Sequence, residues 1–174
     1  MTSALTTYVA LLRAVNVGGT GKLPMSELKA LCTQLGFGRV ETYIASGNVV
    51  FDSELSAPKA QARLTQRLHA YAGREIGVLL RTAQEMRSIL MKNPFHDQKP
   101  NLTYAFFLQD KPLAADLEGV RGRDAERIGL GQREIYVYYP KGVGQSRLKI
   151  PAASFGTARN LNTVAKLVAI SSRQ

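Results

Sequence analysis

Hydrophobic and polar positions along the first third of the chain switch between short apolar runs and stretches with helical spacing. Thr7–Ala14 is a short and almost entirely apolar run, which is typical of a buried strand. Pro24–Leu35 repeats apolar residues at intervals of three and four and stops before Gly36, which predicts a helix. The expected buried face of this helix consists of Leu28, Leu31, Cys32 and Leu35.

Period-two patterns and a second helical stripe follow. Arg39–Ala45 and Asn48–Phe51 are β-prone runs on either side of Ser46-Gly47, a dipeptide that predicts a hairpin turn. Ile76–Arg81 indicates a fourth strand. The helix expected before this strand has Ser56 as its N-cap residue and Pro58 in its first turn. Its apolar stripe consists of Leu64, Leu68 and Tyr71. The order β-α-β-β-α-β is typical of a ferredoxin-like (alpha-beta plait) unit with an antiparallel sheet.

The second half of the chain repeats strands and helices in less room. Thr82-Ala-Gln-Glu85 has the spacing of a capping box and predicts a short helix that ends at Asn93-Pro94. The elements expected afterwards are strands over Thr103–Leu108 and Glu134–Tyr139 and helices over Ala114–Leu117 and Asn160–Ile170. The prediction is an α+β protein of two ferredoxin-like units: residues 1–92 form the first with its short helix, and residues 93–174 form a smaller or degenerate second unit.

Composition places the chain among ordinary globular proteins. Its 174 residues are 45% hydrophobic and 21% charged, enough for one sizeable core or two small ones. No apolar run approaches the roughly 20 residues that span a bilayer, and the first residues lack the pattern of a signal peptide. The single Cys32 lies on an apolar helical stripe, which favours a core residue over a reactive thiol. We therefore expect a cytoplasmic protein with no membrane association.

The charge balance leaves a second class of partner open. Lysine and arginine outnumber aspartate and glutamate by 23 to 13, and no acidic residue follows Glu134. The cations in that acid-free segment are Lys141, Arg147, Lys149, Arg159, Lys166 and Arg173. Such a segment could contact nucleic acid or phosphate, but the six cations are spread out without interleaved aromatics. A solvated basic face explains them equally well.

The connection between the first strand and the first helix is the main candidate site. In a plait the third strand lies antiparallel beside the first, so Arg13 and Asn16 should approach Ser46 and Asn48. The glycine-rich loop, which includes Gly18 and Gly19, leads to the start of a helix, where unpaired N–H groups favour an anion or an amide. The alternative is that both asparagines satisfy backbone groups in their loops.

Known motifs exclude several chemistries. A P-loop fails because Leu23 follows Gly21-Lys22, and a dinucleotide turn from Gly19 would need glycine where Pro24 stands. An RNA-recognition surface fails because the third strand contains one aromatic, Phe51. His96-Asp97 has the composition of a general-base pair or half a metal site, although a polar linker fits better. No metal site, cofactor or catalytic residue is predicted.

A second polar segment precedes the closing helix. Thr157 is the expected N-cap, which would place Arg159 and Asn160 in the first helical turn. A cation there opposes the helix dipole by about 0.3–1 kcal/mol. A bound anion, a carboxylate partner and a solvated arginine all remain open as its explanation.

Four blocks, in order, resemble a bacterial family catalogued as domain of unknown function 1697 (DUF1697). They are Leu-Leu-Arg-Ala-Val-Asn-Val-Gly-Gly, Leu-Pro-Met-Ser-Glu-Leu-Lys-Ala-Leu, Tyr-Ile-Ala-Ser-Gly-Asn-Val-Val-Phe and Gly-Thr-Ala-Arg-Asn. The resemblance implies two plait-like units and no known activity. In the family a tryptophan usually follows the Arg-Asn pair, where this chain has Leu161. The family motifs fall on Arg13, Asn16, Gly18, Gly19, Pro24, Ser46, Gly47, Asn48, Arg159 and Asn160.

These observations favour a protein that binds a small anionic or polar ligand at the glycine-rich loop. The candidate binding residues are Arg13, Asn16, Gly18, Gly19, Ser46, Asn48, Arg159 and Asn160. Sequence-independent nucleic-acid binding through the acid-free segment is the first alternative. An enzyme is the second and is disfavoured, because no histidine, cysteine or carboxylate lies in the loop or in the Ser-Gly-Asn turn.

Overall fold

The computed structural model describes residues 4–16 and 22–173, and the chain divides into two compact units. The first comprises Met1–Met86 and Leu167–Gln174, and the second comprises Arg87–Lys166. The boundaries fall inside helices α3 (Ala83–Met91) and α4 (Leu161–Ser171). The fold is α+β, with two four-stranded antiparallel sheets and four α-helices in the described residues.

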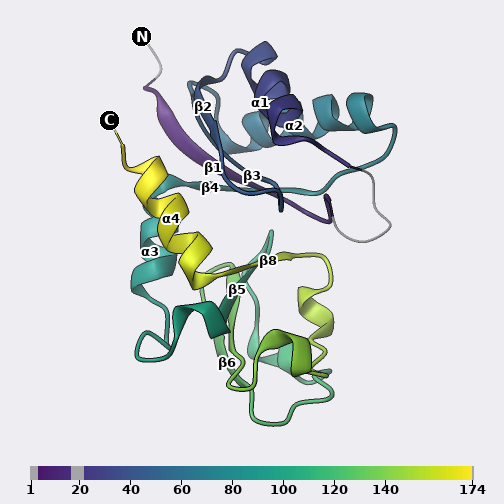
Figure 1. The fold of residues 1–174 in the computed structure, drawn as a ribbon, viewed down its shortest axis with the longest axis vertical. Helices are drawn as coiled ribbons and strands as arrows, with labels where there is room; N and C mark the ends of the chain where they lie inside the picture. The colour runs from purple at the N-terminus through teal and green to yellow at the C-terminus, as the bar shows by residue number, and fades with distance from the viewer. Residues whose placement is uncertain (1–3, 17–21, 174) are drawn as a thin grey trace. The chain divides into compact units, whose positions relative to one another are not determined.

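The first unit contains a sheet in the order β2-β3-β1-β4, in which every neighbouring pair is antiparallel. Its strands are β1 (Thr6–Leu12), β2 (Gly38–Thr42), β3 (Asn48–Ser53) and β4 (Val78–Thr82). The helices α1 (Met25–Gln34) and α2 (Ala57–Ala72) lie on the same face of this sheet (Figure 1). The predicted element order and the neighbouring positions of the first and third strands are confirmed.

The core of the first unit forms between the sheet and the two helices. Leu28, Leu31 and Cys32 of α1 are buried, as their spacing predicts, and Leu35 packs against them. The rings of Phe37 and Phe51 stack with their centroids 4.1 Å apart. Burial raises the pKa of the Cys32 thiol to about 12, so this side chain is an apolar core group and not a reactive thiolate.

Two details of the first unit differ from the sequence prediction. The second strand ends at Thr42, because Ile44 adopts a left-handed backbone with φ of 49° that interrupts an extended run. Tyr71 is 42% exposed, so the apolar face of α2 consists of Ala60, Leu64 and Leu68. Ser56 is the N-cap residue of α2, although its side chain makes no capping hydrogen bond.

The second unit contains the sheet β6-β7-β5-β8, again antiparallel throughout. Its strands are β5 (Thr103–Phe107), β6 (Arg127–Leu130), β7 (Glu134–Tyr138) and β8 (Thr157–Asn160). The expected helix over Ala114–Leu117 is a single 3-10 turn. Further 3-10 turns cover Pro100–Leu102, Val143–Gln145 and Pro151–Ala153. The sequence analysis predicted β5 and β7 but missed β6 and β8.

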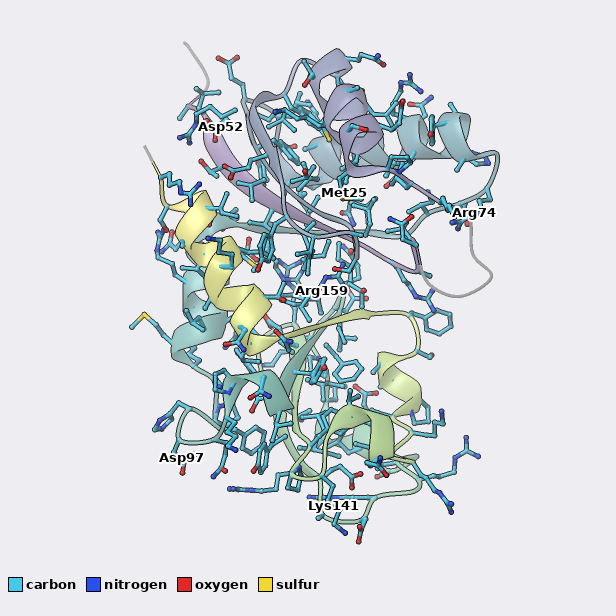
Figure 2. All side chains as sticks on the ribbon, in the orientation of Figure 1. Met25, Asp52, Arg74, Asp97, Lys141 and Arg159 are labelled. Atoms are coloured by element: carbon cyan, nitrogen blue, oxygen red, sulfur yellow. The ribbon has the colours of Figure 1, made fainter. Side chains whose placement is uncertain are left out.

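An acidic side chain on β3 provides a pH-dependent part of the stability. The Asp52 carboxylate, which is labelled in Figure 2, pairs with the Arg39 guanidinium and accepts a hydrogen bond of 2.7 Å from the Thr7 hydroxyl. The hydrogen bond from Arg39 is the largest of the effects that lower the pKa of Asp52.

A lowered pKa in the folded protein means that ionised Asp52 stabilises the fold above the unfolded pKa near 4 and that this stability is lost as the pH falls through the folded value. We expect Asp52→Asn to destabilise the protein at pH 7 and to differ less from wild type near pH 2. Urea unfolding at both pH values measures this difference, and Glu54→Gln, at an exposed position nearby in sequence, is the control. A destabilisation that is equal at both pH values would contradict the assignment.

Candidate functional site

The end of β1 and the start of β3 lie side by side in the first unit. Leu11 faces Asn48 in the antiparallel register, and the Leu12 N–H donates a 2.8 Å hydrogen bond to the Gly47 carbonyl. Gly47 has a φ of 94°, a left-handed conformation that favours glycine. The sequence analysis predicted this meeting of two polar segments, and the strand register confirms it.

The side chain of Asn16 joins three backbone groups from two segments. Its amide nitrogen donates to the carbonyl of Leu23 at 2.8 Å and to the carbonyl of Ala45 at 2.7 Å. Its amide oxygen accepts from the Leu23 N–H at 2.7 Å. Asn16 thereby ties both ends of the glycine-rich connection to each other and to the turn before β3. Gly18 and Gly19 lie outside the described residues.

The side chain of Asn48 serves the same turn from within the core. It is fully buried, and its amide nitrogen donates to the Tyr43 carbonyl at 2.8 Å and to the Ser46 hydroxyl at 3.0 Å. The Tyr43 N–H donates in return to the Asn48 carbonyl at 3.0 Å. Both asparagines therefore hold the shape of the loops, as the structural alternative in the sequence analysis predicted.

Arg13 and Lys22 are exposed cations at the two ends of this connection. The Arg13 N–H donates to the Gly77 carbonyl at 2.9 Å, and a Cβ added at Gly77 would lie 3.2 Å from the Arg13 Cβ. The stem of Arg13 thus passes close to the backbone just before β4. This close approach restricts where the guanidinium can go.

Helix α1 begins at the same connection. Its N-cap residue is Pro24, which makes no side-chain capping hydrogen bond, and Met25, labelled in Figure 2, is its first residue. The Pro24 carbonyl accepts the N–H groups of Glu27 and Leu28 at 3.1 Å each. Since proline offers no side-chain acceptor, the earlier N–H groups of the helix gain nothing from the capping residue.

Arg159 and Asn160 lie in the second unit and differ from the prediction in their local structure. Thr157 is not a helix N-cap, because Thr157–Asn160 forms β8 and pairs with β5. Asn160 takes the capping role instead, and its side-chain oxygen accepts the Thr163 N–H at 2.9 Å. Leu161 is buried.

The Arg159 guanidinium is buried on β8 and does not occupy a first helical turn (Figure 2). It donates to the Thr157 hydroxyl at 2.7 Å and to the Ala158 carbonyl at 2.9 Å. Burial lowers the pKa of Arg159 to about 10, so it stays charged at neutral pH. The predicted position in a first helical turn is therefore wrong, and so is a solvated arginine as its explanation.

Three of the six cations of the acid-free segment make specific contacts. Lys141, in the loop after β7 (Figure 2), pairs with Asp124 at 2.8 Å, and Arg173 pairs with Glu41 at 3.2 Å. Arg159 is buried, as described above. Arg147, Lys149 and Lys166 are exposed, so the segment offers fewer cations to a phosphate backbone than its composition indicates.

Other chemistries find little support among the described residues. No group of three or more histidine, cysteine, aspartate or glutamate side chains gathers there in a way that could hold a metal ion. His96 and Asp97 are both exposed. Within the same described ranges, no helix combines the length and the hydrophobicity that a bilayer crossing requires.

Comparison with known proteins gives a family and a similar solved structure. A family model described as "Protein of unknown function (DUF1697)" matches residues 5–136. The chain is similar to the solved structure of conserved bacterial protein SP0830 from Streptococcus pneumoniae, with 25% sequence identity and a TM-score of 0.81. That match covers 97% of this chain and 100% of the other. No curated protein matches the chain.

Proposed function

The chain belongs to the DUF1697 family, whose function is unknown. We propose that it binds a small anionic or polar ligand at the connection between β1 and α1. Arg13 contacts the ligand through its guanidinium. The start of α1 supplies partial positive charge and backbone N–H groups. Asn16 and Asn48 act as positioning residues, since their amide donors are already bonded within the loops.

One observation carries this proposal. A single side chain, Asn16, fixes both ends of the connection next to a helix whose N-cap residue makes no side-chain hydrogen bond. Fixed ends beside a helix start that has no side-chain cap from Pro24 favour an anion, because fewer groups have to be ordered on binding. Arg13 and Lys22 add positive charge at the same place.

The ferredoxin-like interpretation of each unit is part of the same proposal. In the first unit, the element order β1-α1-β2-β3-α2-β4 with the sheet order β2-β3-β1-β4 supports a plait. In the second unit, a sheet of the same size with 3-10 turns in place of crossover helices supports a degenerate version. In a plait the loop after the first strand lies at one end of the strands, and the proposed site is at this end of β1.

The experiment follows thermal unfolding of the full chain with nucleotides, phosphosugars and amino acids, each at low and moderate salt. A bound ligand raises the midpoint by mass action, and a contact in a defined pocket tolerates salt better than a diffuse charge interaction does. A midpoint that rises only with tRNA or DNA, and only at low salt, would contradict the proposal and favour the acid-free segment.

For a ligand found in this way, we expect Arg13→Ala to weaken binding by about 2 kcal/mol, or roughly 30-fold, because it removes a charged hydrogen bond. Isothermal titration of wild type and variant measures the change. Arg74→Ala is the matched control, since Arg74 is an arginine of the same unit after the end of α2 (Figure 2). Unchanged affinity in Arg13→Ala would sink the proposal.

A further inference from the structure

A cleft of about 440 Å³ lies in the second unit, and none of its lining residues belongs to the proposed site. Its lining includes the rings of Phe106 and Tyr139 and the apolar side chains of Leu148 and Ile150. The two charged residues in the lining are Arg121 and Lys149, and no carboxylate is among the described residues that form it. The cleft therefore combines an apolar interior with positive charge only.

The two cations occupy directly opposite positions of a small antiparallel bridge. The Arg121 N–H donates to the Lys149 carbonyl at 3.0 Å, and the Lys149 N–H donates to the Arg121 carbonyl at 2.8 Å. Residues that exchange both hydrogen bonds in this way place their side chains on the same face of the ladder. Like charges in this position destabilise the pair, so the arrangement favours an anion between them.

The backbone around this bridge has little freedom to separate the two cations. Gly122 has a φ of 70°, and a Cβ built there would lie 2.1 Å from the Arg147 carbonyl oxygen, so the two segments touch at this point. The buried carboxylate of Glu126 connects the same segments, accepting hydrogen bonds from the Ser146 hydroxyl at 2.5 Å and the Asp124 N–H at 2.7 Å.

We propose that this cleft binds a small organic anion, with its apolar part against the two aromatic rings and its charged group between Arg121 and Lys149. A planar guanidinium and an ammonium both attract a carboxylate, sulfonate or phosphate group. The apolar lining favours an organic anion over a bare inorganic ion, since only a ligand with an apolar part removes apolar surface of the cleft from water. Phe155, which follows the lining residue Ser154 in the chain, is 84% exposed and extends the apolar surface near the cleft.

The test uses anilinonaphthalene sulfonate and its uncharged parent, N-phenylnaphthylamine, as a pair of fluorescent probes that differ only in the anionic group. We expect the full chain to bind the sulfonate more tightly than the parent. In the double variant Arg121→Gln, Lys149→Gln the sulfonate should bind at least about tenfold more weakly, as expected when charged contacts are lost, while the parent is unaffected. Equal binding of the sulfonate by wild type and double variant would overturn the proposal, as would an equal loss for both probes.

Two further variants separate this site from general charge and from folding. Lys99→Gln removes one exposed cation of the same unit that does not line the cleft, and it should leave the sulfonate affinity unchanged. Arg121→Glu places opposite charges across the bridge, so it should raise the unfolding midpoint and abolish sulfonate binding. A lowered midpoint in Arg121→Glu, or an equal loss in Lys99→Gln, would contradict the inference. Arg13→Ala should bind the sulfonate as wild type does, which keeps this test independent of the first site.

Discussion

Replacement of Gly47 by alanine is expected to destabilise the protein by about 3 kcal/mol, from about 1–2 kcal/mol of left-handed strain and 1–3 kcal/mol of overpacking. Gly47 has a φ of 94°. A Cβ at this position would lie 2.6 Å from the Cγ2 of Val15 and 2.8 Å from the Cβ of Leu12, and both of these residues are fully buried. Urea unfolding of wild type and variant measures the loss.

Gly73→Ala is the control that separates strain from overpacking. Gly73 ends α2 with a φ of 70°, and a Cβ there would meet no atom within 4 Å. Only the strain of the left-handed backbone applies to Gly73→Ala, so we expect a loss of about 1 kcal/mol of stability. Equal losses in the two variants would mean that the contacts of Gly47 with Leu12 and Val15 contribute nothing. That result would remove the argument that the turn is held tightly against the end of β1.

Much of the first unit was predictable because its elements carry strong local signals. The apolar run of β1 and the helical spacing that ends before Gly36 are properties of neighbouring residues, and both elements form as predicted. The capping box also forms: the Glu85 carboxylate accepts from the Thr82 N–H at 3.2 Å, and the Thr82 hydroxyl accepts from the Glu85 N–H at 3.1 Å. Each of these features depends on a few consecutive positions.

The strands missed in the second unit lack such signals. β8 is only Thr157–Asn160, and its register along β5 stabilises an extended segment that has no apolar pattern of its own. β6 contains Gly129, a residue that weakens a strand pattern in the sequence. In the fold, a Cβ at Gly129 would lie 2.8 Å from the Pro94 Cγ, so close packing requires the glycine. The pairing of β8 with β5 and the packing of Gly129 on Pro94 join residues far apart in the chain, so the spacing of neighbouring residues does not predict them.

The candidate site was predictable in place but not in the roles of its residues. Topology brings the ends of β1 and β3 together, and the sequence contains that information. Most partners of Asn16 and Asn48, in contrast, are backbone groups, those of Leu23, Ala45 and Tyr43, whose side chains give no sign of these bonds. An asparagine that binds a ligand and one that binds a loop look identical in a sequence. Only hydrogen-bond geometry separates them.

Replacement of Asn16 by alanine is expected to destabilise the first unit by about 3 kcal/mol. Three hydrogen bonds to backbone groups are lost, at a net cost of about 2 kcal/mol for this partly exposed side chain. Alanine at a φ of 56° adds about 1 kcal/mol of strain. Asn16→Gly loses the same bonds without the steric strain, so its unfolding in urea should show the smaller loss.

The same pair of variants tests how Asn16 contributes to binding. A positioning residue acts through the loop, so its removal should lower stability and ligand affinity together, whereas Arg13→Ala should lower affinity through the lost ligand contact. Amide hydrogen exchange of Leu23, whose N–H donates to the Asn16 side chain at 2.7 Å, reports directly on the loop and should become faster in Asn16→Gly. Unchanged exchange at Leu23 together with lost affinity would instead make Asn16 a direct ligand contact. In that case Asn16 would not act by holding the ends of the connection, and the observation that carries the proposed function would have to be replaced.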